Sequence, residues 1–83
     1  MENKVFVVYN TLSKRYGDVV AYPTDEYALA RLQPVLSHNG SLDEFELCRV
    51  GSVDVDSGVI TPCPPVRIAW KDLALNDVAS RSV

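Results

Sequence analysis

Cationic and aromatic side chains lie next to one another early in the chain, a combination that can hold single-stranded nucleic acid. Lys14, Arg15 and Tyr16 are consecutive, and cations neutralise phosphates while aromatic rings stack on unpaired bases. Further candidates lie on predicted strands and would join these three if they share a face: Tyr9, Tyr22, Arg49, Arg67 and Trp70. The alternative places these aromatic residues in the core or an interface, and Lys14 and Arg15 on an ordinary solvated turn.

Residue types that occur in catalytic and metal sites are present, but not at the spacing such sites need. His38 is the only histidine, and it falls in a polar loop where no acid or nucleophile can be placed beside it. Asp54 and Asp56 lack the ligand series of a calcium loop and favour a turn. The sequence therefore predicts no catalytic residue, metal ligand or cofactor. An enzyme would need a cleft that gathers His38 or Cys48 with a carboxylate.

The two cysteines, Cys48 and Cys63, favour reduced thiols over a disulfide. One lies in a predicted strand and the other in a proline cluster, without metal-ligand spacing. The N-terminal segment enters a strand directly and lacks the features of a secretory signal. No stretch approaches the roughly 20 apolar residues of a membrane span. These features predict a cytoplasmic protein that does not bind membranes.

Length and charge restrict the possible partners. A chain of 83 residues predicts one domain, and a domain this small buries only a modest part of its surface. The net charge of −3 is unlike the basic charge of most nucleic-acid binders, so such binding would need a local basic patch. A homodimer or larger homo-oligomer would cover the open edges and second face of a small sheet.

The elements that must position the candidate residues begin with two strands, residues 4–10 and 18–22. A polar connection, residues 11–17, joins them as an antiparallel hairpin. The first strand is apolar on both faces, which predicts a central position in the sheet. Its two faces carry Val5, Val7 and Tyr9 on one side, and Phe6 and Val8 on the other.

A helix start follows the second strand. Thr24 is the expected N-cap, and Asp25 and Glu26 lie in the first turn, where the helix dipole favours negative charge. An apolar stripe at helical spacing predicts the buried side of the helix: Ala28, Leu29, Leu32, Val35 and Leu36. Pro34 removes a helical hydrogen bond, so the regular helix either ends near Gln33 or continues as one short final turn.

The second half of the chain reads as a ribbon of strands. Alternation over residues 45–48 and 53–56 predicts two strands, separated by a bend at Gly51–Ser52. A turn is expected at residues 56–58, where Asp56 can cap and glycine accepts a positive φ.

Proline shapes the end of the ribbon. The prolines of residues 61–65 exclude a central strand and favour a stiff extended connector. A last strand follows over residues 66–70. The sequence thus predicts an α+β domain over residues 1–70, with about five antiparallel strands and one packed helix in the order β-β-α-β-β-β. Residues 71–83 are predicted to be a C-terminal tail, flexible or weakly helical.

An ordered set of short motifs runs from about residue 4 to residue 68. It contains a Phe-x-x-Tyr-Asn segment ending at Asn10, then Tyr16, the apolar helix, and a Val-Gly-x-Val-Asp segment over residues 50–54, followed by Ser57–Gly58. This set resembles the small nonstructural protein of gokushoviruses and related Microviridae, bacteriophages with small circular single-stranded DNA genomes. Asn10 stands where that family tends to have an acidic residue, and Val53 where it tends to have an aromatic one.

The resemblance implies a non-enzymatic viral protein in the cytoplasm of an infected bacterium. Such proteins act in genome replication, in the switch to single-strand synthesis, or in packaging, and single-stranded DNA binding suits that role. The alternative is an adaptor that contacts the phage replication initiator, a capsid precursor or a host factor. The acidic balance and the two apolar faces of the predicted sheet favour the adaptor.

Overall fold

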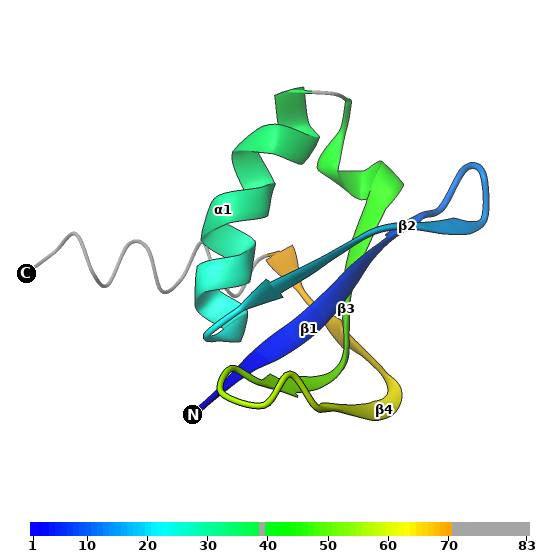
Figure 1. The fold of residues 1–83 in the computed structure, drawn as a ribbon. Coiled ribbons are helices and arrows are strands. Elements are labelled where there is room, and N and C mark those ends of the chain that lie inside the picture. Colours follow the sequence, from blue (N-terminus) through cyan, green and yellow to red (C-terminus); the bar gives the residue numbers. More distant parts are fainter. Residues whose placement is uncertain (39, 71–83) are drawn as a thin grey trace, which may run out of the picture.

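One helix lies on one face of a four-stranded antiparallel sheet (Figure 1) in the computed structural model, which describes residues 1–38 and 40–70. Its elements are β1 (Glu2–Asn10), β2 (Arg15–Tyr22), α1 (Asp25–His38), a short 3-10 turn η1 (Leu42–Glu44), β3 (Phe45–Asp54) and β4 (Ile60–Ile68). The predicted α+β class is confirmed, with four strands in place of about five. The predicted tail over residues 71–83 lies outside the described residues.

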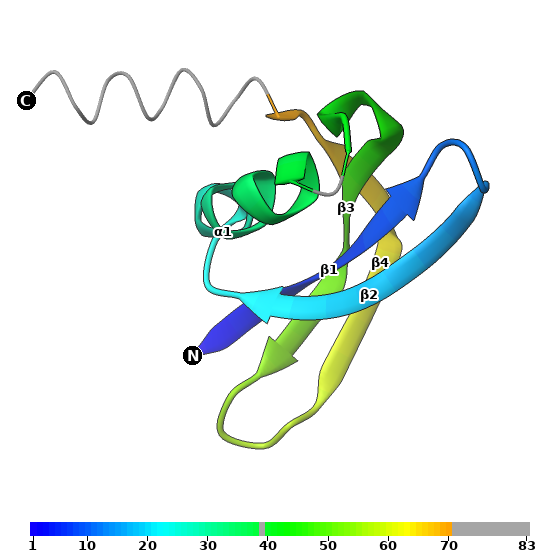
Figure 2. The same cartoon turned by 90° about the horizontal axis from the view of Figure 1, so that it is seen from above.

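The strand order is β2-β1-β3-β4, so β1 is central, as its two apolar faces predict. Directly paired residues point to the same side of a sheet. Phe6 of β1 pairs with Val20 of β2 and Arg49 of β3, and all three point toward α1. Seen from above, α1 lies beside the twisted sheet on this one side (Figure 2).

The opposite side of the sheet is not covered by α1, and we call it the uncovered face. The side chains that the strand registers place on it include Val5, Val7 and Tyr9 of β1, Tyr16, Val19 and Ala21 of β2, Glu46, Cys48 and Val53 of β3, and Ile60 and Arg67 of β4.

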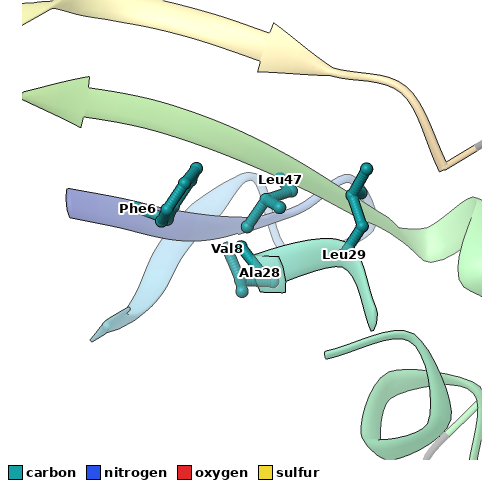
Figure 3. Packing of buried hydrophobic residues seen from close by; sticks show 5 residues of the cluster. All are labelled: Phe6, Val8, Ala28, Leu29 and Leu47. Carbon is teal, nitrogen blue, oxygen red and sulfur yellow. The ribbon is translucent and has the colours of Figure 1, made fainter. Parts of the chain in front are cut away.

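The core is small and forms where α1 meets the two central strands (Figure 3). Phe6, Leu29 and Leu47 are its largest fully buried side chains. Val8 and Ala28 complete the cluster, and a ring of half-buried residues packs around it: Val20, Tyr22, Leu32, Leu36, Phe45, Ile68 and Trp70. Burial of this apolar area is the main force that holds α1 on the sheet.

The start of α1 is formed as predicted. Thr24 Oγ1 accepts a hydrogen bond from the Tyr27 N–H at 3.0 Å, which confirms Thr24 as the N-cap. The helix then runs through Pro34 to His38. The interpretation that it ends near Gln33 is therefore wrong, as is the placement of His38 in a loop.

Packing explains why α1 survives an internal proline. Such a proline costs about 3 kcal/mol in a helix interior. Leu32 and Leu36, on either side of Pro34, both pack against the core. Ending the helix near Gln33 would release Leu36 from the core, so burial on both sides of the proline offsets its cost.

β3 is one continuous strand, so the prediction of two strands with a bend between them is wrong. The interruption at Gly51 is a β-bulge: Arg49 pairs with Phe6 and Gly51 pairs with Val5, which leaves Val50 as the additional residue. A bulge absorbs the glycine without ending the strand.

The proline cluster belongs to β4, so the prediction of a connector over residues 61–65 is also wrong. β4 begins at Ile60 and ends at Ile68, where the sequence predicts a strand over residues 66–70. Its pairing with β3 is irregular between Arg49 and Gly51. β4 is an edge strand, where a missing proline N–H does not break the interior of the sheet.

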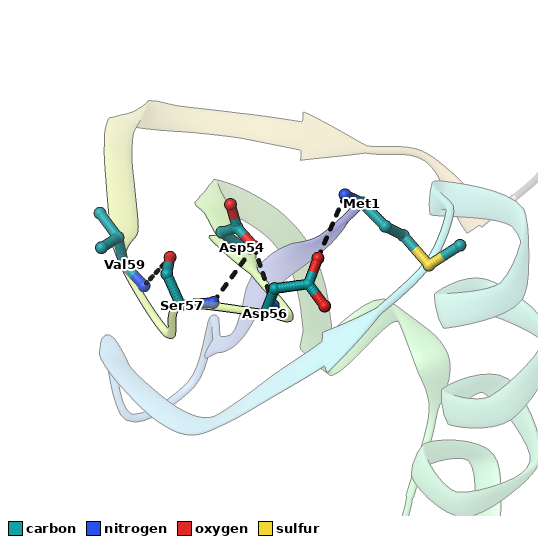
Figure 4. Close-up of polar contacts among 5 residues, drawn as sticks. All are labelled: Met1, Asp54, Asp56, Ser57 and Val59. Carbon is teal, nitrogen blue, oxygen red and sulfur yellow. Dashed lines mark hydrogen bonds and ion pairs between the residues drawn. The ribbon is translucent and has the colours of Figure 1, made fainter.

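The β3–β4 turn is capped by the side chain of Asp54, two positions before Asp56, the capping residue that the sequence predicts (Figure 4). Asp54 Oδ1 accepts the backbone N–H of Asp56 at 2.8 Å and of Ser57 at 3.3 Å. Asp56 instead faces the N-terminal ammonium of Met1 at 3.9 Å, where both groups are exposed and the pair contributes little.

Candidate nucleic-acid interface

The β1–β2 hairpin carries four of the eight candidate residues at its far end, which projects away from α1 (Figures 1 and 2). Asn10 organises the loop: its Oδ1 accepts the backbone N–H of Leu12 at 2.9 Å and of Ser13 at 3.0 Å. Lys14 follows with a left-handed φ of 60°, and its N–H donates to Asn10 O at 2.8 Å. The turn thus fixes the backbone from which Lys14 and Arg15 extend.

Tyr9 and Tyr16 form an aromatic pair on the uncovered face. They are directly opposite in the β1–β2 register, and their ring centroids are 4.8 Å apart with planes at 54°. Tyr16 is 57% exposed. Tyr9 is half-buried, so the exposed ring of Tyr16 is the main surface on which an unpaired base can stack.

Lys14 and Arg15 directly precede Tyr16 at the turn of the hairpin. Both are exposed, and neither forms an ion pair with another of the described residues. Arg15 lines a cavity of about 350 Å³ between β2 and α1, together with Asp18 and Leu36. Lys14, Arg15, Tyr9 and Tyr16 thus lie at one end of the hairpin and form what we call the hairpin site, although Arg15 pairs with Asn10 and points to the α1 side while the two rings point to the uncovered face.

Arg67 lies on the same face but two strands away. Its Nη2 lies 3.3 Å from Glu46 Oε2, and Glu46 is the cross-strand neighbour of Tyr9. The Arg67 side chain is 72% exposed, so the pair is solvent-screened and weak. The positive charge of Arg67 is nevertheless locally balanced by Glu46.

Three candidate residues lie outside the hairpin site because their side chains pack on the α1 side of the sheet. Tyr22 packs at the core and against Tyr27, with ring centroids 5.4 Å apart. Trp70 packs at the core, and its Nε1–H donates to Phe45 O at 2.9 Å. Both match the core alternative considered for these aromatic residues.

Arg49 is the third, and it is held by an ion pair at the beginning of α1. Its Nη1 donates to Asp25 Oδ2, and both side chains are largely buried. The hydrogen bond to Asp25 raises the pKa of Arg49 above its ordinary value. Arg49 thus ties β3 to α1 and is not available to a phosphate.

The partners of these arginines could not be identified from the sequence. Arg49 and Asp25 are 24 positions apart, and Arg67 and Glu46 are brought together only by the β3–β4 pairing. The sequence predicts Asp25 in the first turn of the helix, but it does not predict the ion pair with Arg49.

Burial distinguishes the two thiols, which are both free. Cys48 is the cross-strand neighbour of Arg67 and is buried, whereas Cys63 is exposed. Burial raises the pKa of Cys48, Glu46 raises it further, and Arg67 opposes the shift. A raised pKa favours the neutral thiol, which is not the nucleophilic form.

We therefore expect a thiol reagent to modify one cysteine of the folded protein and two after unfolding. Cys63→Ser should abolish the fast reaction with 5,5′-dithiobis(2-nitrobenzoate) at pH 8, and Cys48→Ser should leave it unchanged. Absorbance at 412 nm measures both. Fast reaction of Cys48 in the folded Cys63→Ser variant would contradict the buried position of this thiol.

Other chemistries find no support in the described part of the chain. Within residues 1–38 and 40–70, no group of three or more His, Cys, Asp or Glu side chains could hold a metal ion. No described helix is long and apolar enough to cross a membrane. His38 is exposed at the end of α1.

Comparison with known proteins does not assign the chain to a family. No family model matches it, and neither a curated protein nor a solved structure is significantly similar to it. The function must therefore be argued from the hairpin site and from the sequence resemblance described above.

Proposed function

We propose that this protein is a non-enzymatic binder of single-stranded DNA and that the hairpin site is its contact surface. The observation that carries the proposal is the Tyr9–Tyr16 pair on the uncovered face, with Lys14 and Arg15 at the adjoining turn. The rings offer stacking platforms, and the cations supply the phosphate contacts.

Two cations per chain make a modest electrostatic contribution. Each neutralised phosphate of a single strand contributes a slope of about −0.7 to the dependence of log K on log salt. A shallow salt dependence is therefore expected for one chain. Stacking should contribute about 1–3 kcal/mol per base and tolerate any sequence.

The test is fluorescence anisotropy of a labelled oligonucleotide at low salt with two paired variants. We expect Tyr9→Leu with Tyr16→Leu to weaken binding by about five-fold or more for each ring that stacks on a base. Lys14→Gln with Arg15→Gln should weaken binding and flatten the salt dependence.

Matched controls lie on α1, away from the hairpin site. Tyr27→Leu removes an exposed ring and Arg31→Gln removes an exposed cation, and neither should change the affinity. No saturable binding at tens of micromolar protein would overturn the proposal. Equal losses in the control variants would overturn the assignment of the site.

The viral role is supported by the sequence resemblance alone. On that basis the protein would act in the cytoplasm of an infected bacterium, during genome replication, single-strand synthesis or packaging. A phage replication initiator or capsid protein would be a natural further partner. A protein of this kind needs no cofactor.

A specific observation favours the adaptor as a second candidate. Away from the hairpin site, the β1 and β2 part of the uncovered face is apolar, with Val5, Val7, Val19 and Ala21, and the charge of Arg67 is balanced by Glu46. Such a surface suits a protein partner better than a phosphate backbone. Recovery of a phage or host protein in a pull-down that Val7→Lys abolishes, with DNA binding absent, would select this function.

A further inference from the structure

The two edges of the sheet differ in their capacity to accept another strand. β4 contains Pro62, Pro64 and Pro65, and a proline has no N–H to donate. Pro64 and Pro65 lie in the stretch of β4 whose register with β3 is irregular, and neither has an N–H to offer a further strand. Proline on an edge strand is a recognised barrier to edge pairing.

β2 lacks proline, and its register with β1 is interrupted once, by a bulge at Gly17 and Asp18 near the hairpin end. It is eight residues long, contains no proline and no lysine, and pairs only with β1 among the described strands. Val19 at its middle is 66% exposed. A free strand of this length presents a row of unpaired N–H and C=O groups, which is a template for another strand.

We propose that a second copy of this chain pairs with β2, antiparallel and about a two-fold axis, to form one continuous sheet of twice the width. A two-fold axis that makes two edge strands antiparallel is perpendicular to the sheet. Both copies of α1 then lie on one side, and both uncovered faces lie on the other. The interface is isologous, because β2 contacts β2.

The sequence of β2 suits pairing with itself. Under this symmetry, one residue must lie opposite its own copy, because paired residues point to the same side. If the two-fold axis passed between the two copies of Asp18, their carboxylates would lie directly opposite each other, which is unfavourable. If the axis passes between the two copies of Val19 or of Val20, valine lies opposite valine and no like charges lie directly opposite each other. Cross-strand pairs of β-branched residues stabilise such ladders.

Exposed apolar side chains of α1 extend this surface beyond the backbone edge. Tyr27 is 48% exposed and its ring contacts Tyr22 of β2. Val35 is 54% exposed and lines the cavity shared with Val20 and Asp18 of β2. Both residues therefore lie on the part of α1 that neighbours β2. Pairing through β2 brings these two side chains toward the second copy, which adds apolar contact to the ladder.

The test is sedimentation equilibrium of the full chain without DNA. We expect the wild type to dimerise, and both Val19→Lys and Val19→Glu to raise the dimer dissociation constant at least about ten-fold, because like charges are then juxtaposed. An equimolar mixture of the two variants should regain the dimer, since opposite charges meet. Ile60→Lys is the matched control on β4, where Ile60 is 61% exposed, and it should dimerise like the wild type.

A measurement without substitutions guards against variants that fail to fold. Amide hydrogen exchange of the wild type should slow in β2, and not in β4, as the protein concentration rises through the dissociation constant. A monomer at 100 µM, dissociation by Ile60→Lys, or concentration-dependent protection in β4 would each overturn the proposal. The dimer is measured without DNA, so its failure is distinct from a failure of the proposed function.

Discussion

Replacement of Phe6 by alanine is expected to remove most of the free energy of unfolding of the domain. Phe6 has 0% of its surface exposed and belongs to the buried cluster formed by β1, β3 and α1. Truncation of a buried phenylalanine costs about 3–5 kcal/mol. Small domains have about 5–15 kcal/mol in total, and a core this small places the chain near the lower end. Urea denaturation followed by circular dichroism measures the loss.

A matched substitution separates the loss of core packing from the loss of a strand residue. Val19→Ala removes an exposed side chain from β2 and should change the free energy of unfolding by about 0.5 kcal/mol or less at protein concentrations where the chain is monomeric. If Phe6→Ala destabilises the chain no more than Val19→Ala does, then α1 does not hold the sheet through this cluster.

Replacement of Gly51 by alanine is the second substitution with a large expected effect. A Cβ at Gly51 would clash with Thr61 O and lie 3.1 Å from the Cα of Pro62. Both are backbone atoms of β4, so the strand itself must move. We expect a loss of roughly 2–3 kcal/mol, as for other cases of overpacking, and loss of protection of the β3–β4 amides in hydrogen exchange.

Gly17→Ala is the matched control for Gly51→Ala. The nearest atom to a Cβ at Gly17 is Val8 O at 3.7 Å, an ordinary contact. Gly17 is exposed in β2, and alanine there should be neutral or stabilising by about 0.5 kcal/mol. Equal destabilisation by the two substitutions would contradict the close approach of β3 and β4 at Gly51.

Features that depend on local sequence were predicted correctly. The two apolar faces of β1 gave its central position, and Thr24 was identified as the N-cap of α1. Tyr9 and Tyr16 pair because the short hairpin brings its two strands together, but β2 begins at Arg15, inside the connection that the sequence predicts over residues 11–17. The hairpin site therefore holds candidates separated by only seven positions or fewer.

Features that depend on tertiary packing were not predicted correctly. Pro34, Gly51 and the prolines of β4 each suggest an interruption that packing overrides. The helix continues because Leu36 is half-buried at the core, and β3 continues because a bulge accepts the glycine. The ion pairs that hold Arg49 and Arg67 join residues from different elements, so no local pattern reveals them.

The prolines of β4 also set a limit on assembly. A sheet that offers backbone donors along both borders can add molecules without end, as fibrils do. Here one border lacks donors at Pro62, Pro64 and Pro65, so a molecule joined through β2 presents no equivalent border for a third. In the proposed dimer both outer edges are β4, so we expect growth along the strand-stacking direction to stop at a pair.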